Sequence, residues 1–148
     1  MLSVRDGCLI SKNLLKIGKK TILICVCEDI WAEQDQFYRR PKVDPLSRVR
    51  GKKIDVVLTI NASPYSDGQF ERRLKAAKEV AKKMKSAHAY VNMVGGQDEI
   101  IYDGGSFAVD KNGKLLARSV FFQEDLNVVD LENAEGSLRL DQSEEILR

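Results

Sequence analysis

The stretch TILICVCEDIW, Thr21 to Trp31, sets the fold class of this chain. Its residues Ile22 to Val26 form a continuous apolar run, which is typical of a strand buried on both faces of a sheet. A cysteine, Cys27, and two acids, Glu28 and Asp29, follow directly. Ligands in α/β proteins commonly bind beyond the carboxyl ends of strands, so we expect chemistry at this junction.

Two more apolar runs, Ile54 to Ile60 and His88 to Val94, predict further strands of the same sheet. Between them, the segment from Ser66 to Ala87 carries apolar residues at spacings of three and four, which predicts an amphipathic helix. Ser66 or Asp67 is expected to cap its first turn. Strands alternating with helices predict an α/β layered fold.

The alternation of long strands and helices ends after the strand predicted at His88 to Val94. SFAVD and KLLARSV predict two short strands joined at Lys111, Asn112 and Gly113, because Asn-Gly is a strong hairpin signal. LNVVDL, Leu126 to Leu131, predicts one more strand. We therefore expect a domain over residues 1–131, followed by a linker or tail over residues 132–148.

The composition fits one globular domain rather than a disordered chain, with 148 residues, 43% hydrophobic and 31% charged. A net charge of +2 gives no strong attraction to nucleic acid or to a membrane surface. No apolar run approaches the roughly 20 residues of a membrane-spanning helix. The three cysteines are few and odd in number, which favours a reducing, cytoplasmic setting over a disulfide scaffold.

Several residues have a simpler structural interpretation than a functional one. The only histidine, His88, begins a predicted strand and has no neighbour that suggests a catalytic dyad. The spacing of the cysteines and His88 matches no standard zinc site, so no metal is expected. The basic side of the predicted helix is expected to be a solvated face, since no aromatic residues interleave it for base stacking: Arg72, Arg73, Lys75, Lys78, Lys82 and Lys83.

Cys27 is the candidate nucleophile. A thiol attacks a carbonyl carbon as its thiolate, so it needs an activating group and a site that stabilises the oxyanion. The end of a strand exposes the sulfur and leaves backbone N–H groups free for that purpose. The alternative is that Cys27 is a small hydrophobic residue of the core, although the acids Glu28 and Asp29 beside it need polar partners.

Two further segments place polar groups after predicted strands. INASPY, Ile60 to Tyr65, brings Ser63 and an aromatic side chain to a strand end; its alternative is an ordinary polar turn. VNMVGGQDEIIYDGGSF, Val91 to Phe107, contains two glycine pairs and several polar residues, which suggests a loop that approaches a ligand. A long surface turn is the alternative there.

Together the segments ICVCEDIW, INASPY and VNMVGGQDEIIYDGGSFAVDKNGKLLAR resemble one family. They look like the glutamine-amidotransferase domain of glutamine-dependent NAD synthetase, a member of the nitrilase, or carbon–nitrogen hydrolase, superfamily. The resemblance runs from about Lys16 to Leu131 and is strongest in VGGQDE and DGGSF. It implies an α/β fold that forms part of a nitrilase-like αββα sandwich.

The resemblance also implies a mechanism and a site. Cys27 would attack the carboxamide of glutamine, release ammonia and form a glutamyl thioester that water hydrolyses. The residues expected to bind or frame glutamine by resemblance are Glu28, Asp29, Trp31, Ser63, Tyr65, Gln97, Asp98 and Glu99. The glutaminase chemistry uses no cofactor, whereas ATP and Mg²⁺ belong to the synthetase domain of the family.

The chain departs from the family pattern in three places. The superfamily's catalytic glutamate and lysine precede the cysteine, but only 26 residues precede Cys27 and none of them is glutamate. No ATP-pyrophosphatase loop is found, and Gln69 stands where many relatives carry a basic residue suited to the substrate carboxylate. We therefore expect half of a glutaminase domain that is inactive alone.

Half a domain leaves one sheet face without its partner. We expect Ile22, Ile24, Ile54, Val56 and Val57 to be hard to cover, so the chain should form a homo-oligomer or pair with a chain that carries the missing half and the synthetase domain. Two alternatives stay open: a catalytically silent remnant that serves as an interaction module, and a different nitrilase-like amidase.

Overall fold

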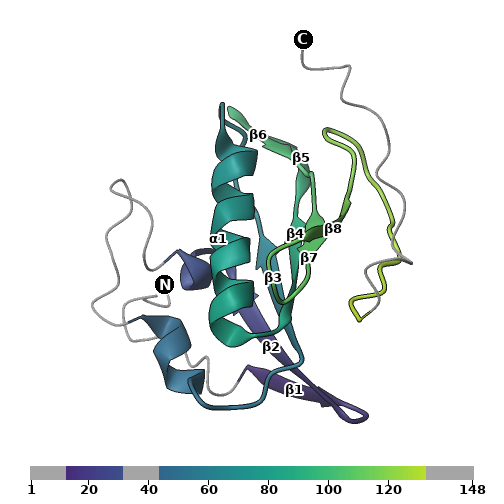
Figure 1. The fold of residues 1–148 in the computed structure, drawn as a ribbon. Helices are drawn as coiled ribbons and strands as arrows, with labels where there is room; N and C mark the ends of the chain where they lie inside the picture. Colours follow the sequence, from purple (N-terminus) through teal and green to yellow (C-terminus); the bar gives the residue numbers. More distant parts are fainter. Residues whose placement is uncertain (1–12, 32–43, 133–148) are drawn as a thin grey trace.

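A computed structural model of the chain describes residues 13–31 and 44–132. The elements are β1 (Leu14–Ile17), β2 (Lys20–Val26), the 3-10 helices η2 (Cys27–Ile30) and η3 (Pro45–Val49), β3 (Val56–Asn61), α1 (Gln69–Met84), β4 (Ala87–Asn92), β5 (Val94–Gln97), β6 (Ile100–Asp103), β7 (Phe107–Val109) and β8 (Leu115–Arg118). Six strands form one sheet in the order β1-β2-β3-β4-β7-β8, and β5 pairs with β6 in a separate hairpin. The predicted α/β class is confirmed, with α1 lying across one face of the sheet (Figure 1).

The three central strands run parallel. In the register of β2, β3 and β4, Val26 lies opposite Ile60, and Asn61 lies opposite Asn92. The carboxyl ends of these strands therefore meet at one edge of the sheet, where η2 and the turn after β3 begin. The outer strands pair antiparallel, β1 with β2 and β7 with β4. β7 and β8 form the hairpin predicted at Asn112 and Gly113.

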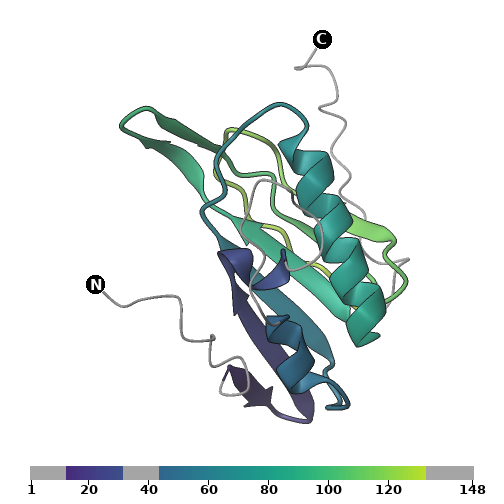
Figure 2. The same ribbon diagram turned by 90° about the vertical axis from the view of Figure 1, so that its left-hand side faces the viewer.

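The core lies between α1 and the sheet face that it covers. Leu23, Val57 and Val109 from the sheet and Ala77 from the helix are completely buried there. The apolar stripe predicted for the helix packs against these residues, and η3 closes the lower part of the same layer with Val49 (Figure 2). Burial of this layer is the main source of stability for the described fold.

The opposite face of the sheet is open over its central strands. Val26, Ile60 and Val91 are 55%, 50% and 44% exposed, whereas Leu23 on the other side of β2 is fully buried. The prediction that β2 is buried on both faces is therefore wrong for the described residues. The prediction that Ile54 and Val57 lack cover is also wrong, since Ile54 is 5% exposed and Val57 is fully buried. Ile22, Ile24 and Val56 are partly buried.

Four details of the chain differ from the sequence predictions. α1 begins after Gly68, which has a left-handed φ of 67°, so neither Ser66 nor Asp67 caps it with its side chain. The expected loop after β4 contains the β5–β6 hairpin, and β1 was not predicted. Residues 126–131 form no strand, because no neighbouring strand pairs with them. No helix among the described residues is long and apolar enough to cross a membrane.

His88 lies completely buried in β4, in the structural position predicted for it. One of its ring nitrogens, Nε2, is 2.7 Å from the Thr59 hydroxyl, and Nδ1 is 3.2 Å from the Ala77 carbonyl oxygen of α1. Burial lowers the pKa of His88 from its ordinary value of 6.5 to about 4. The imidazole is therefore neutral in the folded chain at neutral pH, where it links the sheet to the helix.

This buried histidine predicts a loss of stability in mild acid. The unfolded chain takes up a proton at His88 below pH 6.5, and the folded chain does so only below about pH 4. The free energy of unfolding should therefore fall as the pH drops from 6.5 to 4, by roughly 3 kcal/mol for this group. Urea unfolding at pH 7.5 and pH 5 should show about 2 kcal/mol of this fall, because pH 5 lies above the folded-state pKa of about 4. His88→Gln, which cannot titrate, should show a clearly smaller difference between the two pH values; an equal difference in both proteins would contradict the assignment.

Candidate active site

Cys27 lies where β2 ends and η2 begins, with an unusual backbone conformation. Its φ is 45°, in the left-handed region that residues with a side chain rarely adopt. Such a conformation is strained and persists only where surrounding structure enforces it, as it often does at functional sites. The turn removes Cys27 from the alternation of β2 and leaves the residue half-buried, whereas Cys25, two residues earlier, is fully buried in the core.

Two opposing influences act on the Cys27 thiol. Burial is the largest and raises its pKa above the ordinary value of 9.0, and the negative charge of Glu28 raises it further. Backbone N–H groups of Ala62 and Glu28 hydrogen-bond to the sulfur and lower the pKa. No lysine or arginine of the described residues is among the groups that act on it. The thiol is therefore protonated at neutral pH in this arrangement.

The acids after Cys27 differ in their placement. Glu28 is exposed, whereas Asp29 is buried and its Oδ2 accepts a hydrogen bond of 2.9 Å from the Val26 N–H. Asp29 thus holds the first turn of η2 closed, which fixes the backbone on both sides of Cys27. Trp31, half-buried, packs against the apolar core cluster at the end of the same 3-10 helix.

The turn after β3 borders Cys27 through the N–H of Ala62. The N–H of Ser63 donates to Asn92 Oδ1 at 2.9 Å, and the Asn92 amide donates to the Ser63 carbonyl at 3.3 Å. The amide of Asn61 donates in turn to the Val91 carbonyl at 3.0 Å. These bonds tie the turn to the end of β4. They place Ala62, which lies between Asn61 and Ser63, with its N–H at the Cys27 sulfur.

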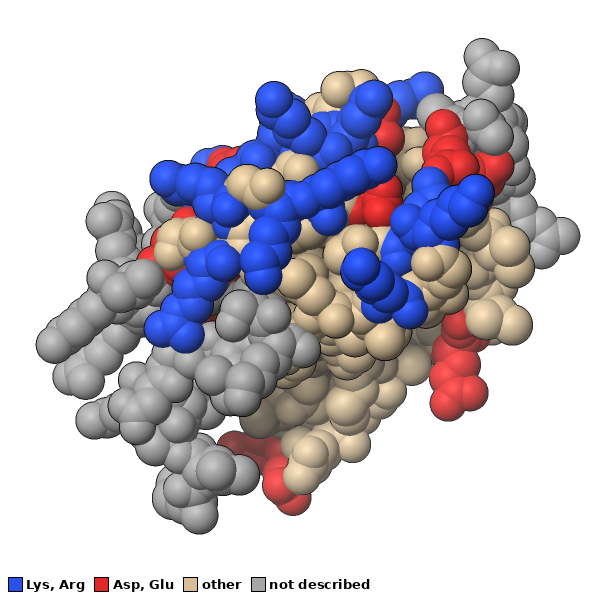
Figure 3. Space-filling model, turned by 90° about the horizontal axis from the view of Figure 1, so that it is seen from below, with Lys and Arg blue, Asp and Glu red and all other residues tan. Residues whose placement is uncertain are grey.

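Arg73 is the largest difference from the sequence predictions at this site. It was assigned to the solvated basic face of α1, but the side chain is completely buried. The other basic residues of that set lie exposed or half-buried, and Lys and Arg side chains gather over one side of the molecule seen from below (Figure 3). The signal was present in the spacing, since Arg73 lies three residues after Phe70 and four before Ala77, on the apolar stripe.

Gln69 and Arg72 lie beside the turn on the exposed start of α1. Arg72 Nε donates to Gln69 Oε1 at 2.8 Å, and its Nη2 donates to the Ser66 hydroxyl at 3.0 Å. Gln69 Nε2 is 3.4 Å from Ser63 Oγ. The position at which the resemblance implies a cation therefore holds a neutral amide, and a guanidinium lies one helical turn further on.

The remaining predicted site residues are Tyr65 and three residues of the β5–β6 hairpin. Tyr65 is 45% exposed, and its ring makes an edge contact with Phe122 at 5.3 Å between centroids. Gln97, Asp98 and Glu99 are exposed at the tip of the β5–β6 hairpin, where Asp98 has a φ of 52°. This hairpin projects from the body of the chain (Figure 2), so the described structure does not bring its tip to the thiol.

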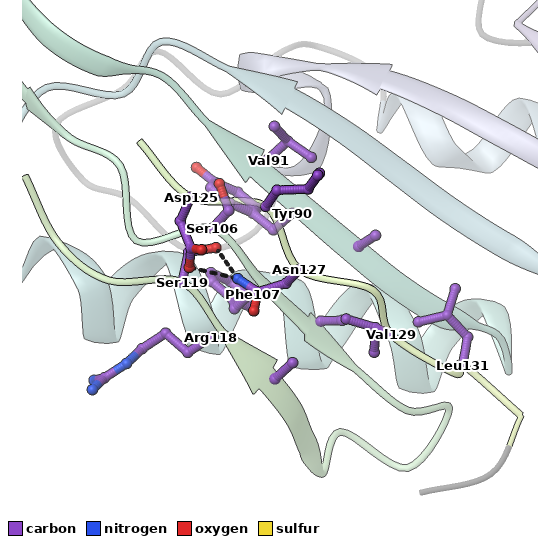
Figure 4. Close-up of a pocket in the computed structure, with 14 residues that line it drawn as sticks. Tyr90, Val91, Ser106, Phe107, Arg118, Ser119, Asp125, Asn127, Val129 and Leu131 are labelled. Atoms are coloured by element: carbon purple, nitrogen blue, oxygen red, sulfur yellow. Dashed lines mark hydrogen bonds between the residues drawn. The ribbon is translucent and has the colours of Figure 1, made fainter. Parts of the chain in front are cut away.

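The structure also has a separate hollow of about 380 Å³. It lies between β4, β7 and β8 and the segment 125–131, and Tyr90, Val91 and Asn127 are among its lining residues (Figure 4). Neither Cys27 nor any residue predicted to bind glutamine lines it. In the part of the chain that the structure describes, no group of three or more His, Cys, Asp or Glu residues is arranged to hold a metal ion.

The arrangement predicts how Glu28 affects the thiol. Its charge raises the pKa of Cys27, so Glu28→Gln should lower that pKa and speed alkylation of Cys27 at pH 8 by about two- to fivefold. The measurement is the rate of reaction with iodoacetamide against pH, with Cys27 resolved by peptide mass spectrometry. Glu71→Gln, on the exposed first turn of α1, is the matched control. An unchanged pH profile for Glu28→Gln would contradict this electrostatic account.

Known proteins resemble this chain in sequence. No protein-family model matches the chain. The chain is 38% identical over 133 residues to glutamine-dependent NAD(+) synthetase of Synechocystis, covering 87% of the chain and 22% of that protein. It is 34% identical over 119 residues to the enzyme of the same name from Thermotoga maritima, covering 80% of the chain and 19% of that protein. The chain thus spans about a fifth of these relatives.

Solved structures of similar proteins share the fold of this chain. The glutamine-dependent NAD+ synthetase of Acinetobacter baumannii superposes with a TM-score of 0.64 at 31% identity, over 76% of the chain and 19% of that structure. A CN-hydrolase superfamily protein from Xanthomonas campestris, XC1258, shares the fold with a TM-score of 0.55 at 19% identity, over 76% of the chain and 40% of that structure. The chain therefore has the fold of the nitrilase, or carbon–nitrogen hydrolase, superfamily, and is homologous to part of the glutaminase region of glutamine-dependent NAD(+) synthetase.

Proposed function

We propose that this chain provides the nucleophile half of a glutamine amidohydrolase. The observation that carries the proposal is Cys27, held at positive φ at a strand end with the Ala62 N–H directed at its sulfur. That N–H lies on the turn that follows β3, and Ser63 beside it presents a polar side chain. A strained thiol facing a backbone donor suits acyl transfer from a carboxamide.

The reaction follows from these groups. The Cys27 thiolate adds to the amide carbon of glutamine, and backbone N–H groups stabilise the negative oxygen that forms. The C–N bond then breaks, the nitrogen takes a proton and ammonia leaves, which gives a glutamyl thioester. Water adds to the thioester, and glutamate departs with the sulfur returned to its thiol form. The described residues supply the nucleophile and the donors for these steps.

The proton transfers need further groups. Burial and Glu28 both hold the Cys27 thiol in its protonated form, and no cation of the described residues opposes them. A base to remove the proton and a cation to stabilise the thiolate and the oxyanion must therefore come from elsewhere. We assign them to a glutamate and a lysine of another segment or another chain, in line with the catalytic triad of the superfamily.

At the level of the whole enzyme, we propose that ammonia passes to a synthetase domain that amidates nicotinic acid adenine dinucleotide with ATP and Mg²⁺. The glutaminase part itself needs no cofactor in this scheme. We propose that residues 1–131 belong to the glutaminase part and that residues 132–148 are a linker or tail. The sparse, odd cysteines favour a cytoplasmic setting.

A second candidate is an interaction module without turnover. Two observations favour it: the Cys27 pKa is raised, and Gln69 is neutral where many relatives have a cation for the substrate carboxylate. In that case the fold and the open sheet face are kept while catalysis is lost.

Ammonia release from glutamine separates the two candidates. We expect the chain alone to release ammonia at least about a thousandfold more slowly than a complemented site, because loss of triad members costs several orders of magnitude. The first half of the Synechocystis relative's glutaminase domain, supplied as a separate polypeptide, should restore release. Cys27→Ala should abolish the restored rate. If complex formation restores no release that depends on Cys27, the chain is the silent module.

The open sheet face predicts association. Val26, Ile60 and Val91 are 55%, 50% and 44% exposed on neighbouring strands, and contiguous apolar surface of this kind marks an interface. We expect the chain to sediment as a dimer or larger species at micromolar concentration. Ile60→Lys should shift it toward the monomer, because a charge on this face cannot be buried without a partner.

Lys75→Glu, on the exposed side of α1, is the control and should leave the sedimentation coefficient unchanged. A monomer at all concentrations up to about 50 μM, for the chain without substitutions, would argue against an interface on this face.

A further inference from the structure

The buried guanidinium of Arg73 joins the end of β6 to the turn after β3, which borders the thiol. Its Nη1 donates to both carboxylate oxygens of Asp103, at 2.8 and 2.9 Å, and this ion pair is almost fully removed from solvent. Its other nitrogens reach the turn after β3. Nε donates to Ser63 Oγ at 3.0 Å, and Nη2 donates to the carbonyls of Ser63 and Pro64, each at 2.9 Å.

Only arginine can make this set of bonds. A guanidinium presents five N–H donors in a fixed plane, so one side can hold a carboxylate while the other holds a peptide turn. A lysine ammonium at this position could keep the ion pair with Asp103 but could not also reach the three acceptors on the turn. The three acceptors all belong to Ser63 and Pro64.

The turn that Arg73 holds carries the donor at the nucleophile. Ala62, directly before Ser63, directs its N–H at the Cys27 sulfur. Asn92 holds the Ser63 backbone from the side of β4, and Arg73 holds it from the side of α1. Because the Ser63 backbone is bonded to both the sheet and the helix, it has little conformational freedom. The direction of the adjacent Ala62 N–H is therefore fixed before any substrate binds.

We propose that Arg73 is a positioning residue for the Cys27 nucleophile, because its hydrogen bonds to Ser63 and Pro64 fix the Ala62 N–H against the sulfur. Asp103 neutralises the buried charge and aims the guanidinium fork at the turn. The inference rests on the proposed role of Cys27 as nucleophile, and it assigns Arg73 no contact with the substrate.

The test measures the thiol directly and needs no glutamine turnover. The rate of Cys27 alkylation by iodoacetamide is followed against pH in the purified chain, with Cys25 and Cys27 distinguished by fragment masses. Arg73→Lys keeps the buried positive charge but loses the planar guanidinium donors that bond Ser63 and Pro64. It should raise the Cys27 pKa by half a unit or more, which is about a threefold or greater fall in the alkylation rate at pH 8.

Val80→Ala is the matched control. Val80 is buried on the same helix, so its truncation destabilises the core without touching the turn, and the Cys27 pKa should stay unchanged. A Cys27 pKa in Arg73→Lys equal to that of the unsubstituted chain would overturn the proposal, as would an equal rise in Val80→Ala. If Arg73→Lys does not fold by circular dichroism, Ser63→Ala decides: it removes one acceptor of the fork and should raise the pKa in the same direction.

The two proposals fail separately. Absence of ammonia release from the complemented chain would contradict the glutaminase function while leaving the alkylation result intact. An unshifted thiol pKa in Arg73→Lys would contradict the positioning role of Arg73 while leaving the ammonia result intact.

Discussion

The site of this chain depends on a buried ion pair between α1 and the end of β6. Arg73 and Asp103 have almost no exposure, and Arg73 and Asn92 together bond the Ser63 N–H and the carbonyls of Ser63 and Pro64 in the turn after β3. Removing one member of such a pair leaves an uncompensated buried charge, which costs about 3–5 kcal/mol. Because the pair links a helix, a turn and a hairpin, it sets where three segments of the site lie relative to the sheet.

The electrostatics of Cys27 are those of an incomplete site. The strained backbone and the Ala62 N–H prepare the sulfur for attack, whereas burial and Glu28 keep its proton in place. A cysteine nucleophile reacts as the thiolate, and the groups of the described residues that favour it are the backbone N–H groups of Ala62 and Glu28. In the proposed glutaminase, the base that removes this proton therefore lies outside the described residues.

The sequence predicted the parts of this fold that depend on strong apolar patterns. Strands β2, β3 and β4 and helix α1 were found from their runs and periodicity, and the β7–β8 hairpin from Asn112 and Gly113. The β5–β6 hairpin was missed because its strands are short, exposed and rich in glycine, like a loop. The strand predicted at residues 126–131 failed because strand formation needs a neighbour, which a local pattern does not reveal.

The sequence singled out Cys27 as a candidate nucleophile, but it did not predict the buried side chains that hold the turn beside it. Cys27 and the turn at Ser63 follow strands, and the parallel register brings those strand ends together. Arg73 was placed with the basic surface because its charge outweighed its position on the apolar stripe. Its two acceptor segments lie 10 and 30 residues away along the chain, so only the folded structure shows why a cation is buried there.

Covalent labelling by a glutamine analogue tests the central claim most directly. A chloroketone analogue of glutamine carries the substrate's amino and carboxylate groups and alkylates a thiol held at the carboxamide position. For the chain complemented with the first half of a glutaminase domain, the account predicts a single adduct on Cys27, slowed by added glutamine and absent in Cys27→Ala. Labelling that glutamine does not slow, or that persists in Cys27→Ala, would contradict a glutamine site at this cysteine.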